Sequence, residues 1–313
     1  MKKSNLTLAI LLVSLLPFCR VVSAAPNDLD DAYAKLKDAQ TAKDADAVLK
    51  LAVETTKLAK SEATGPKLEG YSDDDWSKRV DFAKGVATLC EYALAATAAQ
   101  ADLAPAKVVA LTEALLALNP KSTYVGVASS AYIGALGKMG GADKQIEGAT
   151  KIVAGSPNDE FALMTLADNL IPKNRADQAF TYAERLVTVV KTKAKPEGAS
   201  DEDWNRVKST FLSRGYYDAG VAGCMRQIWK DCDTNLRTAL PMIAGQAGLT
   251  GPAYFYLGVA NYQLAKITAD RTKLQEALKF SQQSAAIPGP MQAQAQQNVT
   301  GMTNELKAPV VRR

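Results

Sequence analysis

The sequence of 313 residues contains no histidine, and aromatic residues make up only 7% of it. Without an imidazole side chain, the protein can form neither a Ser-His-Asp triad nor a Cys-His dyad nor a histidine metal site. The sequence also lacks a glycine-rich phosphate-binding loop and a Ser-x-x-Lys motif. These absences exclude the commonest catalytic routes, and we expect a non-catalytic protein without a cofactor or a metal.

Alanine, in contrast, is abundant, with 53 residues in the chain. Such an excess favours helices, and an apolar fraction of 47% excludes wholesale disorder. Apolar residues recur at spacings of three and four, and no segment alternates between apolar and polar residues over the length of a strand. The sequence therefore predicts an all-α fold.

Residues 1–24 have the pattern of a secretory signal peptide. Two lysines precede a mostly apolar stretch from Leu6 to Phe18, and small residues precede a cleavage site between Ala24 and Ala25. The apolar stretch is shorter than the roughly 20 residues that span a bilayer. A cleaved signal peptide predicts a bacterial protein that is periplasmic or secreted, and a retained membrane anchor is the alternative.

Cleavage would nearly neutralise the chain, because three of its 37 basic residues and none of its 33 acidic residues lie in the signal peptide. The remaining 34 basic and 33 acidic residues give a net charge of +1. Such a chain has no basic field that attracts nucleic acid or anionic lipid. We therefore expect a protein or peptide partner, no nucleic acid, and no membrane span in the mature chain.

Three cysteines follow the signal peptide: Cys90, Cys224 and Cys232. Export favours disulfides. Cys224 and Cys232 are eight residues apart around an expected turn between helices, so a disulfide between them is geometrically feasible, and two free thiols are the alternative. Cys90 lies in an apolar helical stretch, and we expect it to be a buried small apolar residue.

Residues that break helices divide the chain at regular intervals. The apolar periodicity predicts helices around 29–39, 48–58, 73–98, 105–118, 123–139, 142–154, 159–171, 175–192, 201–222, 226–243, 252–266, 271–286 and 291–306. Between them stand a loop at 64–71 and the breakers Asn119-Pro120, Gly140-Gly141, Ser156-Pro157, Pro172, Pro196, Gly248 and Pro288-Gly289-Pro290. Because the turns are short, we expect neighbouring helices to pack as antiparallel hairpins that stack side by side.

An eight-residue segment occurs twice, 128 positions apart: residues 69–76 read EGYSDDDW, and residues 197–204 read EGASDEDW. The Ser-x-x-Asp pattern in each copy is a capping box, and the acidic residues complement the helix dipole. A cation site is the alternative role of these acids. We expect Trp76 and Trp204 to pack each long helix on the preceding hairpin. The recurrence indicates either a duplicated block or two equivalent hairpins with long loops.

A second internal repeat has a period of 34 residues. Residues 126–159 and 160–193 align without a gap, and each reads as a helix, a short turn and a second helix. In a third unit, 251–290, the first helix contains AYFYLGVANY and the second contains EALKF. These units resemble the tetratricopeptide repeat (TPR), which has Leu-Gly and Tyr in its first helix, Ala-x-x-x-Phe in its second and Pro near its end. In 160–193, Leu166-Ala167 replaces Leu-Gly.

The resemblance implies a right-handed α-solenoid over residues 25–308, followed by a flexible tail at 309–313. In this family the first helices line a concave groove that takes a peptide or a partner helix. Phe255, Val259 and Tyr262 share one face of the 252–266 helix, and the resemblance implies that this face looks into the groove; core packing is the alternative. A further candidate for exposed interface anchors is the set Tyr216, Tyr217 and Arg214.

These observations predict an exported TPR-like scaffold or adaptor that binds a protein or peptide in the bacterial cell envelope. One alternative is an envelope enzyme or small-ligand-binding protein with a carboxylate-lined pocket. A second alternative is a structural subunit of an envelope assembly. The sequence leaves the oligomeric state open.

Overall fold

The computed structural model describes residues 28–308, and this part of the chain folds into twelve α-helices and no strand. The predicted all-α class is confirmed. The expected signal peptide at 1–24 and the expected tail at 309–313 lie outside the described residues. The helices are α1 (Asp28–Thr41), α2 (Ala45–Thr64), α3 (Asp73–Ala98), α4 (Pro105–Leu118), α5 (Val125–Gly155), α6 (Glu160–Leu170), α7 (Ala176–Thr192), α8 (Asp201–Met225), α9 (Trp229–Ala239), α10 (Ala247–Thr268), α11 (Arg271–Ala285) and α12 (Gln292–Lys307).

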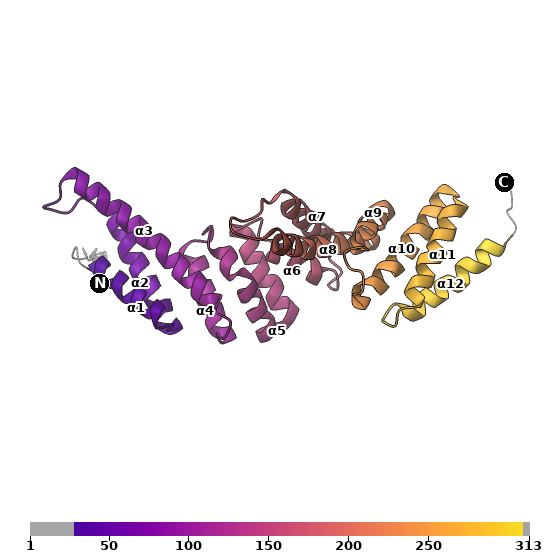
Figure 1. Ribbon diagram of the computed structural model, residues 1–313, viewed down its shortest axis with the longest axis horizontal. Helices are drawn as coiled ribbons and strands as arrows, with labels where there is room; N and C mark the ends of the chain where they lie inside the picture. The colour runs from indigo at the N-terminus through magenta and orange to yellow at the C-terminus, as the bar shows by residue number, and fades with distance from the viewer. Residues whose placement is uncertain (1–27, 309–313) are drawn as a thin grey trace, which may run out of the picture.

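The helices follow one another in a long row, with α1 and α12 at opposite ends (Figure 1). Each helix packs mainly on the helices that precede and follow it in the sequence. One cluster of buried apolar side chains runs from α1 to α8, a second from α8 to α11, and a third joins α10, α11 and α12. The apolar interior therefore continues along the row instead of forming one central core. None of the described helices is both long and apolar enough to cross a membrane.

α5 is interrupted at Gly140 and Gly141, where the backbone leaves helical geometry. Gly141 has a φ of 67°, a left-handed conformation that glycine adopts without steric cost. The two halves of α5 contact each other, because a Cβ atom added to Gly148 would lie 2.3 Å from Cδ1 of Leu136. The predicted break between the helices at 123–139 and 142–154 is therefore confirmed.

Four connections between helices share one turn geometry that the sequence analysis did not predict. In each, a residue with φ between 53° and 59° follows the helix, and the next backbone N–H donates to the carbonyl five residues earlier at 2.9–3.1 Å. This hydrogen bond is typical of the Schellman motif, in which glycine usually takes the left-handed position. Here the position holds Lys43, Asn174, Gln227 and Ala269, so the usual glycine signal is absent.

The predicted start of the α10 helix at residue 252 is wrong. α10 begins at Ala247, and both Gly248 and Pro252 lie inside it. A proline inside a helix removes one backbone hydrogen bond. The segment nevertheless stays helical, and Gly251 beside the proline is buried, with its carbonyl accepting a hydrogen bond from Ser284 Oγ of α11 at 2.9 Å.

α3 and α8 begin in the same way, at the two copies of the repeated segment. Each has a serine cap whose hydroxyl accepts a hydrogen bond from the backbone N–H three residues on, at 3.1 Å in α3 and 3.0 Å in α8. In each preceding loop, a glycine has a positive φ and a lysine pairs with the first acidic residue of the helix. The equivalent residues are Lys67 and Lys195, Gly70 and Gly198, Ser72 and Ser200, and Asp73 and Asp201.

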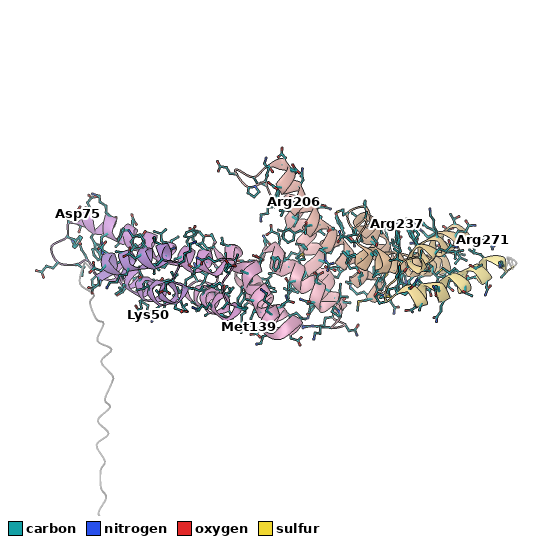
Figure 2. All side chains as sticks on the ribbon, turned by 60° about the horizontal axis from the view of Figure 1, so that its bottom comes forward. Lys50, Asp75, Met139, Arg206, Arg237 and Arg271 are labelled. Atoms are coloured by element: carbon teal, nitrogen blue, oxygen red, sulfur yellow. A yellow bond between two sulfur atoms is a disulfide. The ribbon has the colours of Figure 1, made fainter. Side chains whose placement is uncertain are left out.

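The predicted caps are therefore confirmed, and the two loop-and-helix segments are structurally equivalent. Trp76 and Trp204 are both half-buried, and Trp76 packs edge-on against Tyr71 of its own loop, with 5.6 Å between ring centroids. Figure 2 shows that the first turns of α8, marked by Arg206, project from the row of helices.

Glycine allows α8 to approach α9 closely. A Cβ atom added to Gly220 would lie 2.5 Å from Cγ of Leu236 and 3.0 Å from its backbone nitrogen. Gly85 in α3 differs, because a Cβ atom there would meet no atom within 4 Å. The two glycines therefore stand in helices that begin in the same way but have opposite packing environments.

We predict that Gly220→Ala lowers the free energy of unfolding by about 1–3 kcal/mol, because the added methyl group overpacks the α8–α9 contact. Gly85→Ala, the matched control, raises it by about 0.5–1 kcal/mol because alanine has the higher helix propensity. Urea denaturation followed by circular dichroism measures both. Equal effects of the two substitutions would contradict this assignment of the crossing.

Candidate functional site

Two of the three residues predicted to share a binding face, Val259 and Tyr262, line a cavity of about 360 Å³ between α10 and α12. The hydroxyl of Tyr262 donates to Glu305 at 3.1 Å, and Lys266 pairs with the same carboxylate at 2.6 Å. The hydrogen bond from Lys266 holds the pKa of Glu305 below its usual value. The one carboxylate that lines this cavity is thus engaged with Tyr262 and Lys266.

Phe255, the third residue of that predicted face, does not line the cavity. Its side chain is 7% exposed, and its ring packs edge-on against Tyr256 with 5.4 Å between centroids. The structure therefore brings Val259 and Tyr262 together and places Phe255 in the packed interior.

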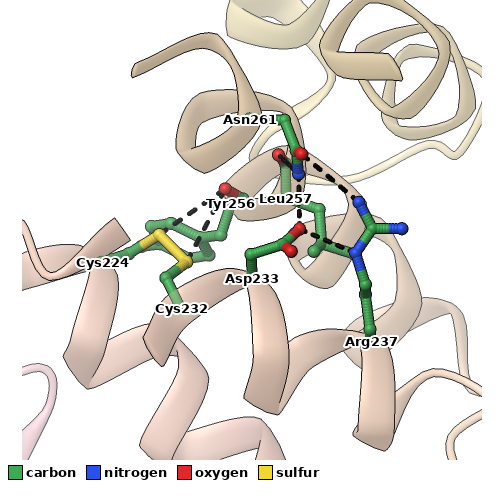
Figure 3. Close-up of a disulfide and its surroundings, with 7 residues drawn as sticks. All are labelled: Cys224, Cys232, Asp233, Arg237, Tyr256, Leu257 and Asn261. Atoms are coloured by element: carbon green, nitrogen blue, oxygen red, sulfur yellow. Dashed lines mark hydrogen bonds and ion pairs between the residues drawn. A yellow bond between two sulfur atoms is a disulfide. The ribbon is translucent and has the colours of Figure 1, made fainter. Parts of the chain in front are cut away.

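A disulfide joins Cys224 at the end of α8 to Cys232 in α9, with an S–S distance of 2.03 Å (Figure 3). The two sulfur atoms lie 3.5 Å and 3.8 Å from the carbonyl oxygen of Tyr256 in α10. The disulfide therefore closes the α8–α9 connection covalently at a point where α10 packs on both helices.

A buried polar network lies beside the disulfide and joins α9 to α10 (Figure 3). Asn261 is fully buried, and its amide donates to Asp233 at 2.6 Å and to the carbonyl of Leu257 at 3.0 Å. Arg237 pairs with Asp233 at 2.8 Å and donates to the amide oxygen of Asn261 at 3.3 Å. Because the amide oxygen and nitrogen of Asn261 both have partners, this network is suited to fixing the position of α10 on α9.

Tyr216, Tyr217 and Arg214, the second set predicted to be exposed anchors, are half-buried. Arg214 forms an ion pair with Asp168 of α6 and lies over the ring of Tyr217, 5.6 Å from its centroid. The guanidinium group of Arg214 is therefore engaged inside the protein.

The carboxyl group of Asp218 lies next to this ion pair and is almost completely buried. Its Oδ2 atom has no hydrogen-bond partner among the described residues. Burial, together with the nearby carboxylate of Asp168, raises the pKa of Asp218 well above its usual value, although Arg214 acts in the opposite direction. The two carboxyl groups are best satisfied by one shared proton. The ring of Tyr217 faces the same cluster, and burial raises its pKa as well.

Four large apolar side chains on α3 and α5 are between 37% and 46% exposed: Phe82, Leu89, Tyr92 and Val127. Tyr124 joins this group, because its ring packs edge-on against Tyr92 with 5.4 Å between centroids. Phe82, Leu89 and Tyr92 follow one face of α3 over ten residues, or about 15 Å. We call these five residues the α3 apolar strip. Exposed apolar side chains along one helix face are typical of interaction surfaces.

The sequence analysis missed this strip, although α3 contained a signal for it. Ala83, Val86 and Cys90 lie on the buried face of the helix, whereas Phe82, Leu89 and Tyr92 extend the apolar residues beyond it. An apolar stripe that is wider than the neighbouring helices cover leaves its edge exposed. The predicted burial of Cys90 is confirmed, and burial raises the pKa of its thiol to about 11.

The sequence matches no protein-family model, and it has no significant match among curated protein sequences. Within residues 28–308, no three acidic or cysteine side chains are placed together to hold a metal ion. Function must therefore be inferred from the surfaces and contacts of this chain.

The buried carboxyl pair leads to a prediction about stability and pH. The pKa of Asp218 is higher in the folded state than in the unfolded state, where it is about 3.9. As the pH rises above about 3.9, the unfolded state loses this proton more readily than the folded state, so the free energy of unfolding falls. Asp218→Asn keeps a donor for Asp168 without the charge. We expect this variant to be about 1–3 kcal/mol more stable than the wild type at pH 7, with the difference shrinking towards pH 4.

Thermal and urea unfolding at both pH values measure this difference. The matched control is Asp38→Asn at an exposed position of α1, which should change stability by less than about 0.5 kcal/mol. A variant at position 218 that is less stable than the wild type at pH 7 would show that the carboxyl group is ionised and satisfied there.

Proposed function

We propose that this protein is an exported, non-catalytic scaffold that binds a protein partner in the bacterial cell envelope. The observation that supports this best is the α3 apolar strip, where large apolar side chains remain exposed beside a fully packed helix face. Aromatic residues are favoured anchors at protein interfaces, and the strip contains three of them. The strip, and not the α10 face predicted from the sequence, is the surface to which we assign partner binding.

We further propose that the helices form a TPR-like right-handed α-solenoid of antiparallel hairpins. Support comes from how the helices coincide with the sequence repeats. The unit 126–159 covers the two halves of α5, the unit 160–193 covers α6 and α7, and the unit 251–290 covers α10 and α11. Helix packing between sequence neighbours is what such repeat proteins use to bury their apolar faces.

The proposed envelope location is supported by two features. Residues 1–24 have the pattern of a signal peptide, and the disulfide between Cys224 and Cys232 is of a kind that persists in oxidising compartments. The alternative of a carboxylate-lined pocket has less support. The cavities of about 360 and 520 Å³ each have one carboxylate in their lining, Glu305 and Asp177, and each carboxylate is in an ion pair.

The strip can be tested with Leu89→Asp, which places a charge in the middle of the proposed interface. Because Leu89 is partly exposed, stability should change by no more than about 0.5–1 kcal/mol. Loss of an apolar contact at the centre of an interface costs about 2 kcal/mol or more. We therefore expect capture of the envelope partner by the purified protein to fall at least tenfold, measured by quantitative mass spectrometry of the captured proteins.

The matched control is Ile267→Asp, because Ile267 is 69% exposed near the end of α10 and lies outside the strip. This control should capture the partner as the wild type does. Equal capture by the two variants and the wild type would refute the site. Light scattering, which measures the molar mass in solution, tests the alternative of an assembly subunit. A wild-type oligomer that Leu89→Asp dissociates would show that the strip binds further copies of the chain.

A further inference from the structure

A second surface feature, separate from the α3 apolar strip, is a cavity of about 520 Å³ between the second half of α5 and α7. Both helices pack on α6, and the cavity lies between them. Ile146 of α5 and Leu166 and Leu170 of α6 give it apolar walls. A volume of this size is typical of sites that hold a small molecule or a short segment of chain.

One face of α7 supplies the polar side of the cavity. Gln178, Thr181, Tyr182 and Arg185 lie on one side of α7 at spacings of three and four, and Arg175, the N-cap residue just before the helix, continues this row. Arg175 and Arg185 are ten residues apart, which corresponds to about 15 Å along the helix axis. The cavity is therefore lined by two arginines, with uncharged polar groups and one carboxylate, that of Asp177, between them.

Among the residues that the structure describes, no carboxylate pairs with Arg175 or Arg185. Of the eight arginines in residues 28–308, five form ion pairs with aspartate or glutamate, and Arg271 donates to a backbone carbonyl. Arg185 donates to the neutral amide oxygen of Asn158 at 3.3 Å. Asp177, the carboxylate in the cavity lining, pairs instead with Arg226 at 2.6 Å. Two guanidinium groups thus remain available for bidentate hydrogen bonds to an anionic ligand.

We propose that this cavity binds an extended acidic segment of a protein partner. One carboxylate of the segment pairs with Arg175, a second pairs with Arg185, and an apolar side chain between them packs on Ile146, Leu166 and Leu170. This site goes beyond the proposed scaffold function, since it is separate from the α3 apolar strip and has a ligand chemistry of its own.

The geometry of an extended chain specifies the spacing of these groups. Alternate residues of such a chain point to the same side and rise by about 3.3 Å per residue, so residues i and i+4 lie about 13 Å apart. That distance fits two arginine side chains whose backbones are about 15 Å apart on α7. Residue i+2 then faces the apolar walls. The recognised sequence is therefore acid-x-apolar-x-acid.

A labelled twelve-residue peptide with Glu-Ser-Leu-Ser-Glu at its centre provides the probe, and fluorescence anisotropy with the purified protein measures its affinity. We expect saturable binding that weakens with added salt. Arg175→Gln and Arg185→Gln should each weaken binding at least tenfold, because each removes a charge-assisted hydrogen bond. Arg206→Gln, an exposed arginine on the projecting part of α8, is the matched control and should bind as the wild type does.

Two further ligands are measured with the wild-type protein, so that their results do not depend on whether the variants fold. A peptide with glutamine in place of both glutamates should bind the wild type at least tenfold more weakly, and suberate, a simple dicarboxylate, should compete poorly. Any of three results would overturn the proposal. The acidic peptide does not bind at millimolar protein, the glutamine peptide binds as tightly as the acidic one, or the Arg175→Gln, Arg185→Gln double variant binds the acidic peptide as tightly as the wild type. Competition by suberate at concentrations as low as those of the unlabelled peptide would assign the cavity to a small dianion instead.

Discussion

Small residues at helix crossings determine how closely the helices of this protein approach one another. At the α8–α9 crossing, a Cβ atom added to Gly223 would lie 3.0 Å from the backbone nitrogen of Cys232, and at the α10–α11 crossing one added to Gly258 would lie 2.5 Å from Oγ of Ser281. Many of the fully buried residues elsewhere in the row are alanines. Interiors packed this closely leave little room for a larger side chain. The close contacts lie between helices that are neighbours in the sequence.

Packing between sequence neighbours produces a long row of helices without a central core. The large surface of such a row offers room for binding sites. The α3 apolar strip lies on the first part of the row, and the arginine-lined cavity lies between α5 and α7. Further along, the disulfide and the Asn261 network hold α8, α9 and α10 together. The net charge of +1 expected after cleavage leaves recognition to such local features instead of a long-range field.

The sequence predicted those features that depend on neighbouring residues alone. The caps at Ser72 and Ser200 follow from hydrogen bonds within a single turn, and the break at Gly140-Gly141 follows from backbone freedom. The start of α10 was missed because glycine and proline are typical helix breakers, whereas here Gly248 and Pro252 both lie inside the helix. The sequence left open whether Phe255 lies in a groove or in the core, and it missed the exposure of Leu89, for a related reason. Periodicity shows which residues share a face, but only the neighbouring helix decides whether that face is covered.

Small-angle X-ray scattering of the purified monomer can show whether the helices pack mainly on their sequence neighbours in solution. A compact domain of this length has a radius of gyration of about 19 Å. For the row of helices we expect a value well above this, together with a pair-distance distribution that has a maximum at short distance and a long tail. A radius of gyration close to 19 Å with a symmetric distribution would contradict it, because it would require contacts between helices that lie far apart in the sequence.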